Sequence, residues 1–90
     1  MTTKTKLLLC QVIFCLGLAN FFVFFVVAVY LGGDAINGKM ENGHFYLMSH
    51  GRLTEVNEDV FAYSKWHCYS VWITHPIAIV AAYWYNRLRL

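Results

Sequence analysis

Charged residues are scarce in this chain of 90 residues, since Asp, Glu, Lys and Arg make up only 13% of the positions whereas 59% are hydrophobic. A soluble domain of this size has too little interior to hide so many apolar side chains. The formal net charge is only +2, well below that of a nucleic-acid-binding surface. The composition therefore argues against a soluble domain and predicts the lipid bilayer, and no nucleic acid, as a partner.

Cysteine pairs and catalytic motifs are also lacking. Cys10, Cys15 and Cys68 form no Cys-x-x-Cys pair, so the sequence indicates neither a disulfide framework nor a zinc knuckle. The chain has no glycine-rich phosphate loop, no Gly-x-Ser-x-Gly elbow and no His-Glu-x-x-His motif, the usual signatures of several enzyme classes. We therefore expect no enzymatic activity and no cofactor.

Proline occurs once, at Pro76, so long helices meet few interruptions. After a short polar head, 1–6, the apolar run 7–31 is long enough to span roughly 30 Å of hydrocarbon. A cleaved signal peptide has a shorter apolar core and a small-x-small cleavage site, so we expect an uncleaved transmembrane helix. A second helix is predicted over 57–86 with its membrane span at about 66–85, followed by a basic tail, 87–90.

The connecting segment 32–56 has the composition of turns and short strands. Gly32-Gly33 predicts the end of the first helix, and Asn37-Gly38 and Asn42-Gly43 predict tight turns. The runs 44–48 and 53–56 predict a β-hairpin with a four-residue connection, and a third strand near 35–40 is weakly indicated. The predicted fold is an all-α membrane protein, a two-span transmembrane helical hairpin with a small extramembrane β-hairpin in its loop.

Basic residues flank both predicted spans. Lys4 and Lys6 precede the first span, and Arg87 and Arg89 follow the second. Positive charge is retained on the cytoplasmic side of a membrane. The sequence thus predicts a multi-pass protein of a bacterial-type inner (plasma) membrane, with both termini cytoplasmic and the loop 32–65 periplasmic or extracellular.

His75 and Pro76 stand near the middle of the second predicted span. An ionisable residue at that depth is costly and often functional, and proline removes a backbone hydrogen bond and bends a helix. One interpretation is a proton-accepting or ligand-binding imidazole held at a kink. The favoured alternative is a neutral histidine hydrogen-bonded to Asn20 or to a partner helix, because no carboxylate lies at the same depth.

A polar stripe is predicted along the same helix. Its members are spaced 4, 4, 3 and 4 positions apart, which places them on one helical face: Asp59, Tyr63, His67, Ser70 and Thr74. One interpretation is a hydrated groove or proton path. The favoured one is a protein-facing side whose hydroxyls bond to backbone carbonyls.

Three histidines, His44, His50 and His67, are the candidate metal ligands. Two imidazoles and a carboxylate suffice for zinc or copper, but the spacing here matches no established ligand pattern. Haem held by two histidines would require a homodimer, because the first helix contains no histidine.

The functional prediction is a non-enzymatic accessory or regulatory subunit that binds a larger membrane protein. The alternative is a self-associating channel or proton-conducting homo-oligomer with His75 in its lumen, and a metal or haem carrier is the least favoured. The residues expected to make polar contacts or helix packing are Asn20, His67, Ser70, Thr74, His75 and Pro76.

Overall fold

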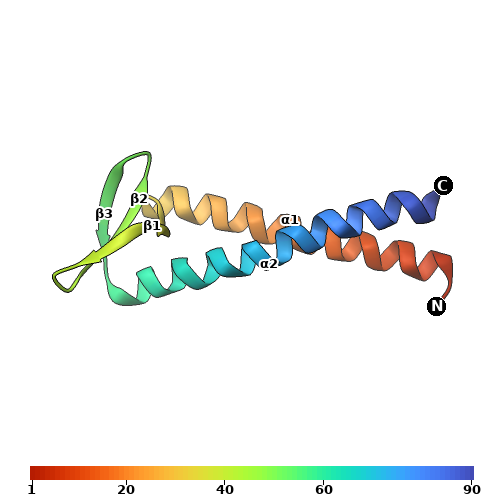
Figure 1. The fold of residues 1–90 in the computed structure, drawn as a ribbon, viewed down its shortest axis with the longest axis horizontal. Helices are drawn as coiled ribbons and strands as arrows, with labels where there is room; N and C mark the ends of the chain where they lie inside the picture. Colours follow the sequence, from red (N-terminus) through yellow and green to blue (C-terminus); the bar gives the residue numbers. More distant parts are fainter. The chain divides into compact units, whose positions relative to one another are not determined.

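The computed structural model describes residues 1–90 as two long helices with a small antiparallel sheet between them in sequence (Figure 1). The elements are α1 (Thr3–Leu31), β1 (Asp34–Glu41), β2 (His44–Ser49), β3 (Arg52–Val56) and α2 (Glu58–Arg89). The chain forms two compact units. Residues 1–22 and 71–90 make the helix-pair unit, and residues 23–70 make the sheet unit.

The helix ends are capped by local hydrogen bonds. At the start of α1, the amide of Thr5 donates to Thr2 Oγ1 at 3.2 Å. At its end, the amides of Gly32 and Gly33 both donate to the carbonyl of Ala28, at 3.0 and 2.8 Å, and both glycines have positive φ. This confirms the predicted glycine stop, because a left-handed backbone at this position satisfies the last carbonyls of a helix.

The sheet is a meander in the order β1-β2-β3, with β2 in the centre. The predicted hairpin is therefore present, but within three strands rather than two. Its predicted four-residue connection is wrong, since Ser49 pairs with Arg52 and only His50 and Gly51 form the turn. Both turn residues have positive φ, 51° and 81°, as a two-residue type I′ hairpin turn requires.

Of the two predicted Asn-Gly turns, one is confirmed. Asn42 and Gly43, with φ of 52° and 79°, connect β1 to β2. The turn expected at Asn37-Gly38 is wrong, because both residues lie inside β1, where the pairing with β2 shifts between Asp34 and Lys39. The strand absorbs the extra residues as a bulge.

A small core holds the sheet unit together. Leu47 of β2 is fully buried, at 0% exposure, and packs with buried Ala35 of β1 and Phe61 of α2. The rings of Phe45 and Phe61 have centroids 5.3 Å apart. The first turns of α2, begun by the Asn57 Oδ1 cap on the Val60 amide at 2.8 Å, therefore provide the surface on which one face of the sheet is buried.

The helix-pair unit contains an antiparallel pair, the amino-terminal part of α1 against the carboxyl-terminal part of α2. Contacts run in opposite chain directions, from Gln11 with Tyr85 to Asn20 with Thr74. The two chain termini accordingly lie at one end of this unit (Figure 1).

Only α1 is long and apolar enough to cross a membrane by length and composition. The second predicted span is not supported by this criterion. The reason lies in the composition of α2, where two histidines, a proline and many Trp and Tyr residues reduce the mean hydropathy. The fold established is thus two helices and a three-stranded sheet.

Candidate functional site

The two helices of the helix-pair unit approach each other closely at Gly17, the one buried residue of α1. A Cβ atom at this position would lie 2.7 Å from the Cβ of Ala78 and 2.9 Å from the carbonyl oxygen of Thr74. Small residues at such a contact let two helices pack closely where apolar solvent gives no hydrophobic driving force. Ala78 is itself buried, at 3% exposure.

Asn20 and Thr74 form the polar contact of this helix pair. The Asn20 side-chain amide donates to Thr74 Oγ1 at 3.1 Å, and the bond is partly buried. Both residues are among the predicted helix contacts, and the structure brings them together one turn from Gly17. An interhelical hydrogen bond of this kind fixes the register of the two helices.

His75 lies next to this bond, against the aromatic ring of Phe21. The two ring centroids are 5.0 Å apart, and His75 Nδ1 is buried without a hydrogen-bond partner. Thr74, which accepts the bond from Asn20, is the residue before this imidazole. Pro76 is exposed, and α2 continues through it to Arg89.

His67 and Ser70 belong to the sheet unit, where α2 packs against the last turns of α1. His67 Nδ1 lies 2.6 Å from the hydroxyl of Tyr63, and its ring meets that of Phe24 at 5.2 Å in an edge-to-face arrangement. The hydroxyl of Ser70 donates to the carbonyl of His67 at 2.7 Å. These contacts are those of helix packing and of a hydroxyl bonded to its own helix.

The loop histidines stand apart from one another. His44 Nδ1 is 2.7 Å from Glu55 Oε2, with both side chains more than half exposed, while His50 is at an exposed turn and His67 is on α2. No group of three or more His, Cys, Asp or Glu residues is placed to hold a metal ion. The structure thus does not gather the candidate ligands into one site.

An ion pair on β1 was missed by the sequence reasoning. Lys39 Nζ lies 2.8 Å from Glu41 Oε2. The hydrogen bond and the charge of Lys39 lower the pKa of Glu41, and those of Glu41 raise the pKa of Lys39. Their two-residue spacing places both side chains on one face of the strand, so the signal was present in the sequence.

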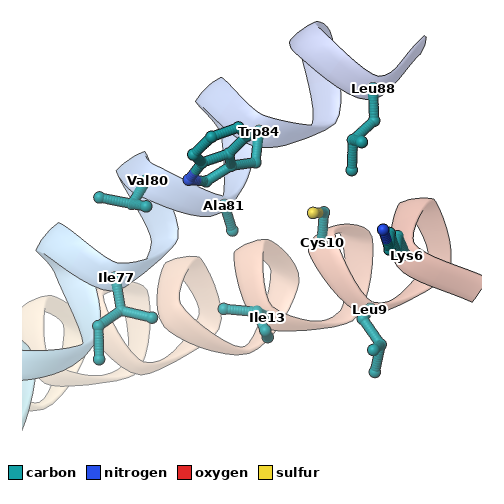
Figure 2. A pocket seen from close by; sticks show the side chains of 9 residues that line it. All are labelled: Lys6, Leu9, Cys10, Ile13, Ile77, Val80, Ala81, Trp84 and Leu88. Atoms are coloured by element: carbon teal, nitrogen blue, oxygen red, sulfur yellow. The ribbon is translucent and has the colours of Figure 1, made fainter. Parts of the chain in front are cut away.

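A groove on the helix-pair unit was also missed. It has a volume of about 480 Å³ and is lined by Leu9, Cys10 and Ile13 of α1 and by Ile77, Val80 and Trp84 of α2. Figure 2 shows Lys6 and Leu88 together at one end of this groove, with Ile13 and Ile77 toward the other. The position of this groove depends on which faces of the two helices meet. The sequence did not indicate these faces. We call it the Lys6 groove.

No protein family, curated protein or solved structure matches this chain.

Proposed function

We propose that the chain is a small integral membrane protein whose two helices both cross the bilayer, and that it acts as a non-enzymatic accessory or regulatory subunit of a larger membrane protein. The observation that carries the proposal is the exposure of apolar side chains along both helices. On α1 these include Leu16 and Phe22, at 66% and 65%, and on α2 Ile73 and Ile79, at 63% and 59%. Surfaces of this kind are covered by lipid or by other helices.

The aromatic residues of α2 support a second span. Trp66 and Trp84 are exposed, at 64% and 52%, and stand 18 positions apart in the same helix. At a rise of ~1.5 Å per residue this is about 27 Å of helix, close to the ~30 Å thickness of a bilayer core. Tryptophan concentrates at both membrane interfaces, so a low mean hydropathy is compatible with a span bounded by such rings.

The sheet unit supports a protein partner. Its central strand is β2, so β1 and β3 each leave one edge unpaired, and exposed strand edges can bind further strands. A groove of about 400 Å³ also lies between the sheet and α2, lined by Met40, Phe45 and Tyr69 among others. Met40 itself is 67% exposed. A three-stranded sheet with these features is well suited to contact the extramembrane part of a neighbouring protein.

The proposed topology places both termini in the cytoplasm and the sheet outside an inner (plasma) membrane. It is tested with single-cysteine variants on a background in which Cys10, Cys15 and Cys68 are replaced by alanine. A membrane-impermeant maleimide added to intact cells should label Gly43→Cys but not Thr2→Cys or Asn86→Cys. Labelling of all three positions, or of Thr2→Cys alone, would contradict this topology.

The partner is tested by photocrosslinking in native membranes. A photoreactive amino acid replaces Met40 on the sheet or Ile73 on α2, and a matched variant carries it at Thr3, near the start of α1. We expect both of the first two variants, but not the third, to crosslink to the same larger protein, which should also co-purify in mild detergent. Recovery of the free chain alone from all variants would contradict the proposal.

The channel alternative receives less support. It needs His75 in a lumen between copies, whereas this imidazole is half-buried against Phe21 of its own chain. Its test is proton flux into liposomes. Flux that is present with the native chain and lost with His75→Ala would favour the channel over the accessory subunit.

A further inference from the structure

We propose that the Lys6 groove binds one anionic phospholipid, with an acyl chain along its apolar floor and the phosphate at the Lys6 ammonium. The inference rests on the proposed membrane insertion of both helices. It names a ligand class that the proposed accessory function does not include.

The first argument is the distribution of charge. The helix-pair unit carries four charged side chains, all basic, namely Lys4, Lys6, Arg87 and Arg89, because every Asp and Glu lies between residues 34 and 59. All four lie in the end of the unit at which the chain begins and finishes, and Lys6 also lines the groove. An anion entering from this end meets positive charge and no carboxylate side chain.

The second argument is the shape and polarity of the groove. Apart from Lys6, its walls are apolar, with Trp84 at mid-length. It extends from residue 6 to 13 on α1 and from 77 to 88 on α2, about 10 and 16 Å of helix at ~1.5 Å per residue. Half of a ~30 Å bilayer core is about 15 Å, so the groove matches the depth of a single leaflet.

The third argument comes from the proposed orientation. The basic end would lie at the cytoplasmic leaflet, where anionic lipids are enriched and basic pockets between helices bind their headgroups. A second groove of similar size, about 460 Å³, lies in the same unit and includes Gln11 and Phe14 but no basic residue. The Lys6 groove differs from this second groove by the positive charge of Lys6. This charge favours an anionic lipid over a neutral one.

The experiment measures contact between Trp84 and lipid in the full chain. Trp66→Phe and Trp72→Phe leave Trp84 as the single tryptophan, and the protein is reconstituted in phosphatidylcholine vesicles containing phosphatidylglycerol. One of the two lipids is brominated at a time, because bromine on the acyl chain quenches tryptophan on contact. We expect the relative association constant to favour phosphatidylglycerol about fivefold, the effect of one basic residue near an anionic surface.

Two matched variants locate the preference. Lys6→Gln should reduce the ratio of the two association constants to about one. Lys4→Gln removes the same charge outside the groove lining and should leave most of the preference for phosphatidylglycerol. Equal quenching by the two lipids in the starting protein would overturn the proposal. Equal effects of the two variants would also overturn it, in favour of a diffuse basic end.

Two further outcomes separate this proposal from its premise. Extraction of the chain from the vesicles by alkaline carbonate would contradict membrane insertion itself, and with it the lipid site. Retention in the membrane together with weak quenching that rises as the protein is diluted in lipid would show that a second copy covers the groove. That result would overturn the lipid site alone.

Discussion

Gly17 of α1 lies so close to α2 that a Cβ atom placed on it would be 2.7 Å from the Cβ of Ala78. This contact sits one turn from the Asn20–Thr74 hydrogen bond. Close approach and a polar bond thus occur together, and they define how the two helices of the helix-pair unit meet. The stability of this unit should therefore respond to substitutions at either contact.

Replacement of Gly17 by leucine should weaken the helix pair by about 1–3 kcal/mol, the usual cost of overpacking a close contact. The Thr74 carbonyl oxygen, which would lie 2.9 Å from a Cβ atom at position 17, belongs to the backbone and cannot move aside without shifting α2. The measurement is equilibrium unfolding in mixed detergent micelles, followed by tryptophan fluorescence. Ala19→Leu, at an exposed position of the same helix, is the control and should change stability by less than about 0.5 kcal/mol.

The hydrogen bond between Asn20 and Thr74 should give a coupling energy of about 0.5–1 kcal/mol in a double-mutant cycle, as interhelical bonds in membranes do. The cycle combines Asn20→Ala with Thr74→Val, which keeps the shape of the threonine side chain but removes the hydroxyl. Unfolding of the two single variants and the double variant is compared in the same micelles. Strict additivity of the two changes would show that this bond contributes nothing.

Replacement of His75 by leucine should leave the helix pair as stable as before or stabilise it by about 1 kcal/mol, because an unpaired buried nitrogen is removed. His67→Leu serves as the contrasting variant and should destabilise the sheet unit, since it removes the contact with the Tyr63 hydroxyl. Unfolding in mixed micelles measures both. A loss of more than about 1 kcal/mol with His75→Leu would mean that the imidazole makes a stabilising polar contact.

Ser64→Ala should destabilise the sheet unit by about 1–3 kcal/mol, the cost of leaving a buried donor unpaired. Ser64 is buried, at 3% exposure, and its hydroxyl accepts the hydrogen bond of the Ala35 amide at 2.9 Å. Faster hydrogen exchange at Ala35 should accompany the loss. Ser49→Ala, at the end of β2, is the control, and equal exchange rates in the two variants would contradict the assigned role.

The ion pair of Lys39 and Glu41 predicts that folding stability depends weakly on pH, once in the acidic range and once in the alkaline range. Because the pKa of Glu41 is lowered in the folded protein, its contribution is present above the unfolded pKa and is lost as the pH falls through the folded pKa. Because the pKa of Lys39 is raised, its contribution is lost only as the pH rises through that higher value. Lys39→Gln should move the Glu41 pKa back toward its usual value in an NMR titration, whereas Lys65→Gln should not. High salt should reduce the difference in Glu41 pKa between the native chain and Lys39→Gln, since both groups are exposed.

The local elements could be predicted from the sequence because short-range chemistry determines them. The glycine stop after Leu31 and the Asn42-Gly43 turn each depend on residues that are neighbours in the chain. The predicted turn at Asn37-Gly38 was wrong for the converse reason. Pairing of β1 with β2 and the fit of Ala35 into the core overrode the local preference of that dipeptide.

For the predicted polar residues, too, the sequence indicated which side chains are involved but not which contacts they make. The sequence indicated Asn20 as a partner for His75, but not that Asn20 would bond to Thr74 or that the ring of Phe21 would lie against the imidazole. Such a choice depends on the rotation of each helix about its axis. Successive residues of a helix point about 100° apart, so Thr74 and His75 face different neighbours.

Composition and chain-local patterns by themselves determined two long helices, a strand-rich connection and basic residues at both outer ends, because hydrophobic runs, caps and turns act over a few residues. Only the tertiary structure decided the shifted pairing of β1 with β2, the Ser64–Ala35 bond, the contact of Gly17 with Ala78 and the Lys6 groove. Each of these joins residues that are distant in the chain. Their positions are set by packing between whole elements, which no short stretch of sequence contains.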